Sequence, residues 1–177
     1  MARAVFRYWG ISPWEIEVLY GYFSSRFDVI QEEIEQEDTR FASHIGVRMP
    51  VAFSDEFFKW FEYRRWERVK ALFKEMKRRR GSGNAIRVDL VFEGNRSIRF
   101  RMDSEDKQWF DNSVEKLDFV LELLPYHTQK LPPAAHTMEY RFDTQAVRWR
   151  LHEARAGDRT YRFRGDRWHM MEDDDDT

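Results

Sequence analysis

Apolar residues alternate with charged ones in two stretches of the C-terminal half, and this period of two constrains the fold more than any other feature of the sequence. In residues 86–102 the apolar positions are Ile86, Val88, Leu90, Phe92, Ile98, Phe100 and Met102. Successive side chains of a β-strand point to opposite faces, so each strand has one apolar and one charged face. The stretch therefore predicts an antiparallel hairpin that turns near Gly94 and Asn95.

The register of this hairpin follows from keeping its apolar residues on one face. A two-residue turn mixes the faces, whereas a three-residue loop over 93–95 pairs Leu90 with Ile98. On the charged face, Asp89 then lies opposite Arg99. We therefore expect the three-residue loop.

The same pattern recurs in residues 138–165, where it predicts three further strand segments. Loops over 143–146 and 155–157 place the apolar residues of these segments on one face, with Tyr140 opposite Trp149. The opposite face then collects Arg141, Arg148, Arg150, Arg162 and Arg164. In this register the arginines lie across from one another, with Glu139 as the acid beside them.

Three helices are expected in the remaining sequence. The first begins at residues 12–15, where Ser-Pro-Trp-Glu offers an N-cap serine, a proline at the first helical position and a glutamate that closes a capping box. Its apolar spacing of three and four continues to Ile34, and its exposed side is acidic. The second helix is expected over 54–80, and the third over 104–124, before a proline-rich connector.

These elements predict an α+β protein of one domain, residues 1–171, because 177 residues suit a single core. The fold is expected to be an antiparallel sheet of about five strands, in two hairpin or meander units, packed with about three helices. Residues 172–177 are almost all acidic, too charged to pack, and are expected to form a disordered tail.

Composition excludes several classes of site. The chain has no cysteine, which removes disulfides, thiolate metal sites and cysteine nucleophiles. Its five histidines show no metal-ligand spacing, and its serines lack a nucleophile elbow, so we expect no catalytic residue, metal or cofactor. The sequence shows neither a membrane-length apolar run nor a signal sequence, which predicts a cytoplasmic protein without a membrane partner. It does not indicate an oligomeric state.

The arginine face is the strongest functional signal. Like charges directly opposite on a sheet are destabilising, so the face favours a nearby anion. That anion is either a nucleic-acid backbone, held by these arginines together with Arg99 and Arg101, or an internal cover provided by the acidic first helix or the acidic tail. Arginine makes up 23 of the 30 basic residues and suits phosphate contacts. Codon bias could produce that ratio but not the placement.

The second expected helix adds a further hint. Its basic side has Lys70, Lys74 and Lys77, which would extend a phosphate track, and Trp60 and Tyr63, which would stack on bases. The alternative is that both aromatic rings pack against another element of the protein.

One family resemblance points to an enzyme. Residues 140–144, Tyr-Arg-Phe-Asp-Thr, followed by Arg-Trp-Arg-Leu at 148–151, resemble a strand pair of the triphosphate tunnel metalloenzymes. That resemblance implies a barrel lined with charged residues that hold a triphosphate and a divalent metal. The family's Glu-x-Glu-x-Lys strand does not precede the pair here. We therefore expect a non-catalytic protein that binds single-stranded or structured DNA or RNA. The alternatives are a phosphate-handling enzyme and a protein-interaction module whose arginines are covered by acidic surfaces.

Overall fold

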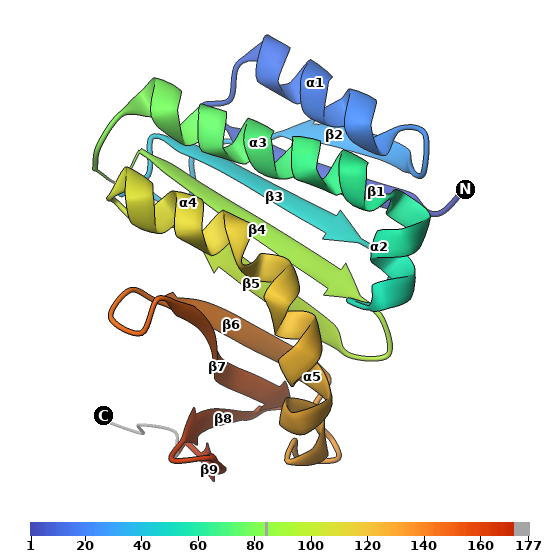
Figure 1. Ribbon diagram of the computed structural model, residues 1–177, viewed down its shortest axis with the longest axis vertical. Helices are drawn as coiled ribbons and strands as arrows, with labels where there is room; N and C mark the ends of the chain where they lie inside the picture. Colours follow the sequence, from blue (N-terminus) through green and yellow to red (C-terminus); the bar gives the residue numbers. More distant parts are fainter. Residues whose placement is uncertain (84, 172–177) are drawn as a thin grey trace.

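The computed structural model describes residues 1–83 and 85–171 as one mixed sheet with helices on one face (Figure 1). The strands are β1 (Arg3–Trp9), β2 (Asp28–Glu33), β3 (Ser43–Met49), β4 (Ile86–Glu93), β5 (Ser97–Met102), β6 (Thr137–Asp143), β7 (Arg148–Ala156), β8 (Arg159–Arg164) and β9 (Arg167–Met170). The helices are α1 (Pro13–Phe23), α2 (Asp55–Phe61), α3 (Tyr63–Arg80), α4 (Lys107–Glu115) and α5 (Val120–Gln129), with a 3-10 turn, η1 (Leu117–Phe119), before α5. The strand order is β2-β1-β3-β4-β5-β6-β7-β8-β9.

The predicted antiparallel sheet of about five strands with about three helices is wrong. The sheet has nine strands and includes three parallel pairs, β1 with β2, β3 with β4 and β5 with β6. Each parallel pair is joined by a helical crossover, whereas the neighbouring pairs are antiparallel. Alternation within one strand reports its two faces but not the direction of its partner, so the sequence pattern does not reveal parallel pairing.

The hand of the third crossover decides which face stays uncovered. With all helices on one side, the connections β1–α1–β2 and β3–α2–α3–β4 are right-handed, whereas β5–α4–α5–β6 is left-handed (Figure 1). About 98% of such connections are right-handed. Because β4 already occupies one side of β5, a right-handed path to the free side would place α4 and α5 on the other face of the sheet. The left-handed path therefore leaves that face open.

The first fifty residues differ most from expectation. Helix α1 begins as predicted: the Ser12 hydroxyl accepts from the Glu15 N–H at 3.3 Å, and the Glu15 carboxylate accepts from the Ser12 N–H at 3.1 Å. The helix ends at Phe23, however, and residues 28–33 form β2 against β1 instead of continuing it. Strands β1 and β3 were not predicted.

The expected second helix also breaks at Glu62, whose φ of 76° separates α2 from α3.

The β4–β5 hairpin has a three-residue loop, but over 94–96 and not over 93–95. A β-carbon on Gly94 would lie 2.8 Å from the Ala52 β-carbon, so the loop packs where only glycine fits. The register is shifted by two residues, which keeps every side chain on its predicted face. Charge partners change, and Asp89 lies opposite Arg101.

The core lies between the sheet and the helices. Each central strand contributes its apolar side, including Phe6, Val88 and Phe100, while α3 contributes Trp66 and Phe73, all of them fully or almost fully buried. Within the described ranges, the structure has no helix long and apolar enough to cross a membrane. The acidic tail predicted at 172–177 lies outside the described residues.

Candidate functional site

The side of the sheet that faces away from the helices, here called the open face, displays charged side chains in rows that cross the strands. One row, called the Gly46 row, runs from β2 to β7 as Glu32, Arg7, Gly46, Asp89, Arg101, Arg141 and Arg150. The next, called the Arg99 row, runs from β2 to β8 as Ile30, Val5, Arg48, Val91, Arg99, Glu139, Glu153 and Arg162. Neighbouring strands are about 4.8 Å apart, so side chains within a row are in reach of one another.

Lysine is confined to the helical side of the sheet, whereas arginine lies on both sides. By strand register, the arginines of the open face are Arg3, Arg7, Arg48, Arg87, Arg99, Arg101, Arg141, Arg148, Arg150, Arg155, Arg162, Arg164 and Arg167. The carboxylates of the same strands and face are fewer: Asp28, Glu32, Asp89, Glu93, Glu139, Asp143 and Glu153. Every lysine lies in a helix or at a helix end. Codon bias alone predicts no such segregation.

All seven arginines predicted from the sequence lie on the open face, but most have acidic partners. Arg101 forms a bidentate ion pair with Asp89, donating from Nε to Oδ1 at 2.8 Å and from Nη2 to Oδ2 at 3.1 Å. Arg150 pairs with Asp143 at 2.9 Å. Looser pairs join Arg141 to Glu139 at 3.5 Å and Arg162 to Glu153 at 3.7 Å.

The opposed arginines are not the predicted pairs: Arg101 lies opposite Arg141, and Arg164 lies opposite Arg167. Arg141 lies opposite Arg150, but Arg148 lies opposite Asp143 and Arg162 opposite Glu153. The β6–β7 register differs from the predicted one because the connecting loop spans 144–147 and not 143–146. A two-residue turn at 157–158 also replaces the longer loop expected between β7 and β8.

Three of the predicted arginines keep their charge available. Across residues 1–83 and 85–171, no carboxylate oxygen lies within 4.0 Å of Arg99, Arg148 or Arg164. Arg99 is partly buried at the centre of the open face, whereas Arg148 and Arg164 are exposed toward the β7–β8 end. Arg99 is thus the unpaired cation at the middle of the rows.

The three predicted lysines lie on the other side of the sheet. Lys77 is fully buried and donates to the carbonyl oxygens of Gly83 at 2.9 Å and Glu105 at 2.7 Å. Lys70 pairs with Asp118 at 3.1 Å, and Lys74 pairs with Glu115. Burial lowers the pKa of Lys74 and of Lys77. These lysines join α3 to the segment around α4 and do not extend the arginine rows.

The two predicted stacking aromatics are also on the helical side. Trp60 and Tyr63 keep 45% and 42% of their surface exposed. The Trp60 ring packs edge-on against Phe27 at 5.2 Å, and the Tyr63 hydroxyl donates to Asp55 at 2.8 Å. The structure therefore does not bring either ring to the open face.

Two hollows on the open face together form one trough. The first, of about 220 Å³, lies over β1, β3, β4 and β5 with Gly46 and Asp89 in its lining. The second, of about 230 Å³, extends over β6 and β7, where Glu139 and Glu153 line it. Both are lined by Arg48, Val91 and Arg99, so the hollows adjoin one another. We call this combined depression the trough. Each hollow has far more room than the roughly 10–15 Å³ that one water needs.

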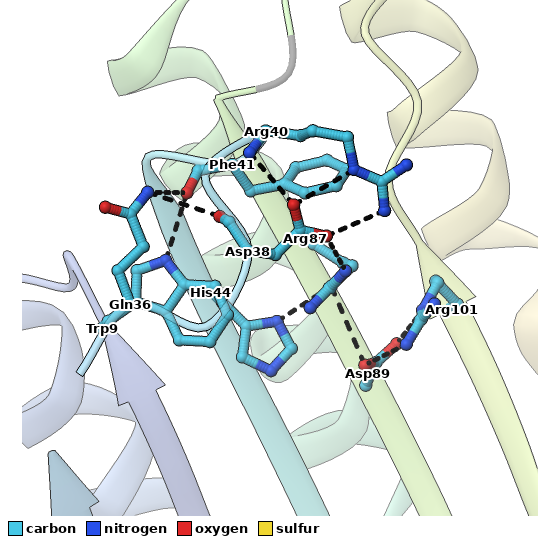
Figure 2. A network of polar contacts seen from close by, with 9 residues as sticks. All are labelled: Trp9, Gln36, Asp38, Arg40, Phe41, His44, Arg87, Asp89 and Arg101. Carbon is cyan, nitrogen blue, oxygen red and sulfur yellow. Dashed lines mark hydrogen bonds and ion pairs between the residues drawn. The ribbon is translucent and has the colours of Figure 1, made fainter. Parts of the chain in front are cut away.

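A buried polar network holds one side of the trough in place (Figure 2). Arg87 donates from Nε to His44 Nδ1 at 3.1 Å and from Nη1 to Asp38 at 3.0 Å. Its guanidinium lies 5.0 Å from the centre of the Phe41 ring, while the His44 ring stacks on Trp9 at 4.5 Å. The network anchors the loop of residues 34–42 against the ends of β3 and β4.

The electrostatics of this network fix the protonation of His44. Burial lowers the pKa of His44 to about 4, and the positive charges of Arg87 and Arg101 oppose its protonation further. Because Arg87 Nε can only donate, Nδ1 of His44 is the acceptor and the ring proton lies on Nε2. Hydrogen bonds from Arg40 lower the pKa of Asp38, which therefore stays ionised beside Arg87.

Sequence reasoning missed the residues that shape the first hollow. Arg7, His44, Gly46, Arg48 and Arg87 line it, and none was a candidate. A signal was present in β3, where Ser-His-Ile-Gly-Val-Arg-Met at 43–49 has the same period of two as the later strands. Its central glycine interrupts the alternation of apolar and charged residues and hid that period.

The features of a metalloenzyme tunnel are not found in the part of the chain that the structure describes. The sheet stays open, with β2 and β9 as its two edges. Among these residues no group of three or more histidine, aspartate or glutamate side chains is placed to hold a metal ion. The segment that resembles the tunnel enzymes forms the β6–β7 hairpin of this open sheet.

Comparison with known proteins adds no relative. The chain matches no family model, and neither the curated proteins nor the solved structures contain a match to it. The function must therefore be argued from the open face and its trough alone.

Proposed function

We propose that the open face binds a single-stranded or structured nucleic acid through its backbone phosphates and does so without catalysis. The observation that carries this proposal is the segregation of basic residues: the open-face strands use arginine alone, and every lysine lies with the helices. Arginine offers a planar fork of donors that matches a phosphate, whereas lysine is a point charge. Either arginine or lysine would keep an exposed face soluble, so solubility alone does not explain why these strands have arginine and no lysine.

The arrangement of charge supports a long, flexible anion as the ligand. The carboxylates of the open face orient particular arginines, as Asp89 does for Arg101, and leave an excess of positive charge spread across the strands. At the centre, Arg99 faces the trough without a carboxylate partner in the described residues. A backbone with repeated single charges suits several modest contacts better than one deep pocket.

The position of α1 argues against internal cover by the acidic helix. Its buried Glu15 accepts from Arg80 of α3 at 2.7 and 2.8 Å, which ties α1 to the helical layer. The open face thus lies on the opposite side of the sheet from this helix (Figure 1).

Salt dependence with matched variants tests the proposal. A labelled single-stranded oligonucleotide is titrated with the protein at several salt concentrations. Replacing Arg99 and Arg141 together by alanine is expected to lower the slope of log affinity against log salt by roughly 1 to 1.5, since each lost phosphate contact on a single strand is worth about 0.7. The control replaces Arg64 and Arg68, two exposed arginines of α3, and removes the same charge from the helical side.

Equal slopes for the wild type and for Arg99→Ala/Arg141→Ala would reject the open face as the binding surface. A loss in the control variant of the same size as in the open-face variant would mean that net charge, and not position, governs binding.

A further inference from the structure

The trough ends at the hollow above Gly46. On one side this hollow adjoins the second hollow at Arg48 and Arg99. At the other side its lining includes Ile34 and Glu37, which belong to the loop of residues 34–42 that the Arg87 network anchors. The loop of residues 34–42 therefore closes this end of the trough. A nucleic-acid strand lying in the trough would end here, so the hollow above Gly46 suits the terminus of a ligand better than its middle.

Residue 46 lines the hollow and, being glycine, places no side chain in it. A β-carbon added to Gly46 would lie 3.5 Å from His44 Nε2 and 3.7 Å from the Arg7 carbonyl oxygen, in ordinary van der Waals contact. Gly46 does not have a positive φ, so its backbone does not require glycine. A glycine in the interior of a strand often marks a site that another group approaches closely.

Hydrogen-bond donors outnumber the two carboxylates, Glu37 and Asp89, in the lining of this space. His44 presents Nε2–H toward Gly46, because its Nδ1 already accepts from Arg87. Arg101 uses Nε and Nη2 on Asp89 and keeps Nη1, while Arg99 has no acidic partner among the described residues. Arg7 and Arg48 complete the cationic lining, and each is paired outside it, to Glu32 and Glu93 respectively.

We propose that the hollow above Gly46 binds a phosphomonoester, either the terminal phosphate of a nucleic-acid strand or the phosphate of a free mononucleotide. A monoester has close to two negative charges at pH 7 and three acceptor oxygens, whereas an internal diester has one charge. The cluster of arginines and the imidazole N–H match the former. For a strand end the inference rests on the proposed function of the open face; for a mononucleotide it stands alone.

Oligothymidylates of one length that differ only at their ends test the proposal. One has hydroxyl groups at both ends, one a 5′-phosphate and one a 3′-phosphate. We expect one phosphorylated form to bind about tenfold more tightly than the hydroxyl form at the same salt concentration, because charge-assisted hydrogen bonds to a dianion are about twice as strong as neutral ones.

Gly46→Val is the variant that fills the hollow. Valine suits an extended strand, so the fold is expected to persist, and Gly46→Ala is the milder replacement if it does not. Filling the hollow should abolish the advantage of the phosphorylated end, so that the phosphorylated and hydroxyl oligonucleotides bind the variant with equal affinity. Gly21→Ala, on α1, is the matched control and should retain the advantage.

The outcomes separate this inference from the proposed function. If phosphorylated and hydroxyl ends bind equally well, or if Gly46→Val keeps the advantage of the phosphorylated end, the terminal-phosphate site is rejected and the open face remains a nucleic-acid surface. If no oligonucleotide binds but a nucleoside monophosphate does, and Gly46→Val removes that binding, the proposed function is rejected and the hollow is a mononucleotide site. If neither ligand binds, both proposals are rejected.

Discussion

The two faces of the sheet use neighbouring residues of the same strands for different purposes. On β5, Phe100 points to the helices, where its ring lies 4.8 Å from Phe53, 5.2 Å from Tyr140 and 5.4 Å from Trp149. The preceding residue, Arg99, points to the open face and lines the trough. The apolar contacts that stabilise the fold are therefore on the helical face. The open face contributes less to stability and can carry unpaired charge.

The faces also differ in how they treat buried charge. On the helical side, individual charges have local partners: Glu15 pairs with Arg80, and Lys77 donates hydrogen bonds to two backbone carbonyls. On the open face, charges form a chain across strands, in which Arg87 and Arg101 share Asp89. The first arrangement stabilises contacts between elements, and the second holds arginine side chains in fixed orientations.

The largest difference in stability between the two faces is expected when Phe100 and Arg99, which are neighbours on β5, are each replaced by alanine. Phe100→Ala is expected to lower the free energy of unfolding by about 3–5 kcal/mol, because it removes a buried ring from the centre of an aromatic cluster. Arg99→Ala should change it by less than about 0.5 kcal/mol, since the side chain has no ion pair with any residue that the structure describes. Urea denaturation measures both. Comparable losses would mean that the faces are not independent.

The open face should respond to mild acid through His44. Its folded pKa of about 4 lies below the ordinary value of 6.5, so the unfolded chain binds the proton more readily. The stability contributed by the neutral ring is complete above pH 6.5 and is lost as the pH falls toward 4, on the order of 3 kcal/mol in total. His44→Asn keeps an acceptor for Arg87 and should flatten this part of the pH profile. An unchanged profile would contradict the buried neutral imidazole.

The helical face should show a further response at lower pH, through Glu15. Burial alone would raise the pKa of this carboxyl, but hydrogen bonds from Arg80 and Ser12 outweigh it and hold the pKa at about 2, against an ordinary value of 4.5. Its contribution is complete above pH 4.5 and is lost as the pH falls from 4.5 toward 2, again on the order of 3 kcal/mol. Glu15→Gln should lower stability at neutral pH and remove this acid-sensitive step, measured by denaturation at each pH. Retention of the step would assign it to other carboxyls.

The smallest effect is expected for the aromatic rings of the helical side. Replacing Trp60 and Tyr63 by alanine should change oligonucleotide affinity by less than about twofold, although a ring that stacks on a base is worth about 1–3 kcal/mol. Both rings are far from the trough because they lie on the other side of the sheet. Fluorescence titration at constant salt decides the matter. A tenfold loss would move the nucleic-acid surface to the helices.

The sequence predicted the faces of the later strands but not their partners. Alternation placed Arg99 and Phe100 on opposite sides correctly because it is a local property of one strand. The register of β4–β5 was off by two residues, since the contact of Gly94 with Ala52 that positions the loop is a tertiary one. Parallel pairing through helical crossovers produces no local sequence pattern. The nine-stranded sheet could therefore not be predicted from the sequence.

The candidate site was predictable only in part for the same reason. The arginines of β5–β8 could be grouped from their own strands, whereas Gly46 matters only because Arg7 and Asp89 lie on either side of it in the sheet. The lysines of α3 fit a basic helical face by spacing, but Lys77 is directed inward to backbone carbonyls of a distant loop. Long-range contacts of this kind are invisible to periodicity.

Arginine footprinting tests most directly whether the open face is the binding surface. The protein is treated with an arginine-selective dicarbonyl reagent, with and without a saturating single-stranded oligonucleotide, and the modified positions are read by mass spectrometry. We expect the oligonucleotide to protect Arg99 and Arg141 on the open face, while Arg64 and Arg68 on α3 stay equally reactive. Protection of the α3 arginines with no change at Arg99 and Arg141 would contradict binding at the open face.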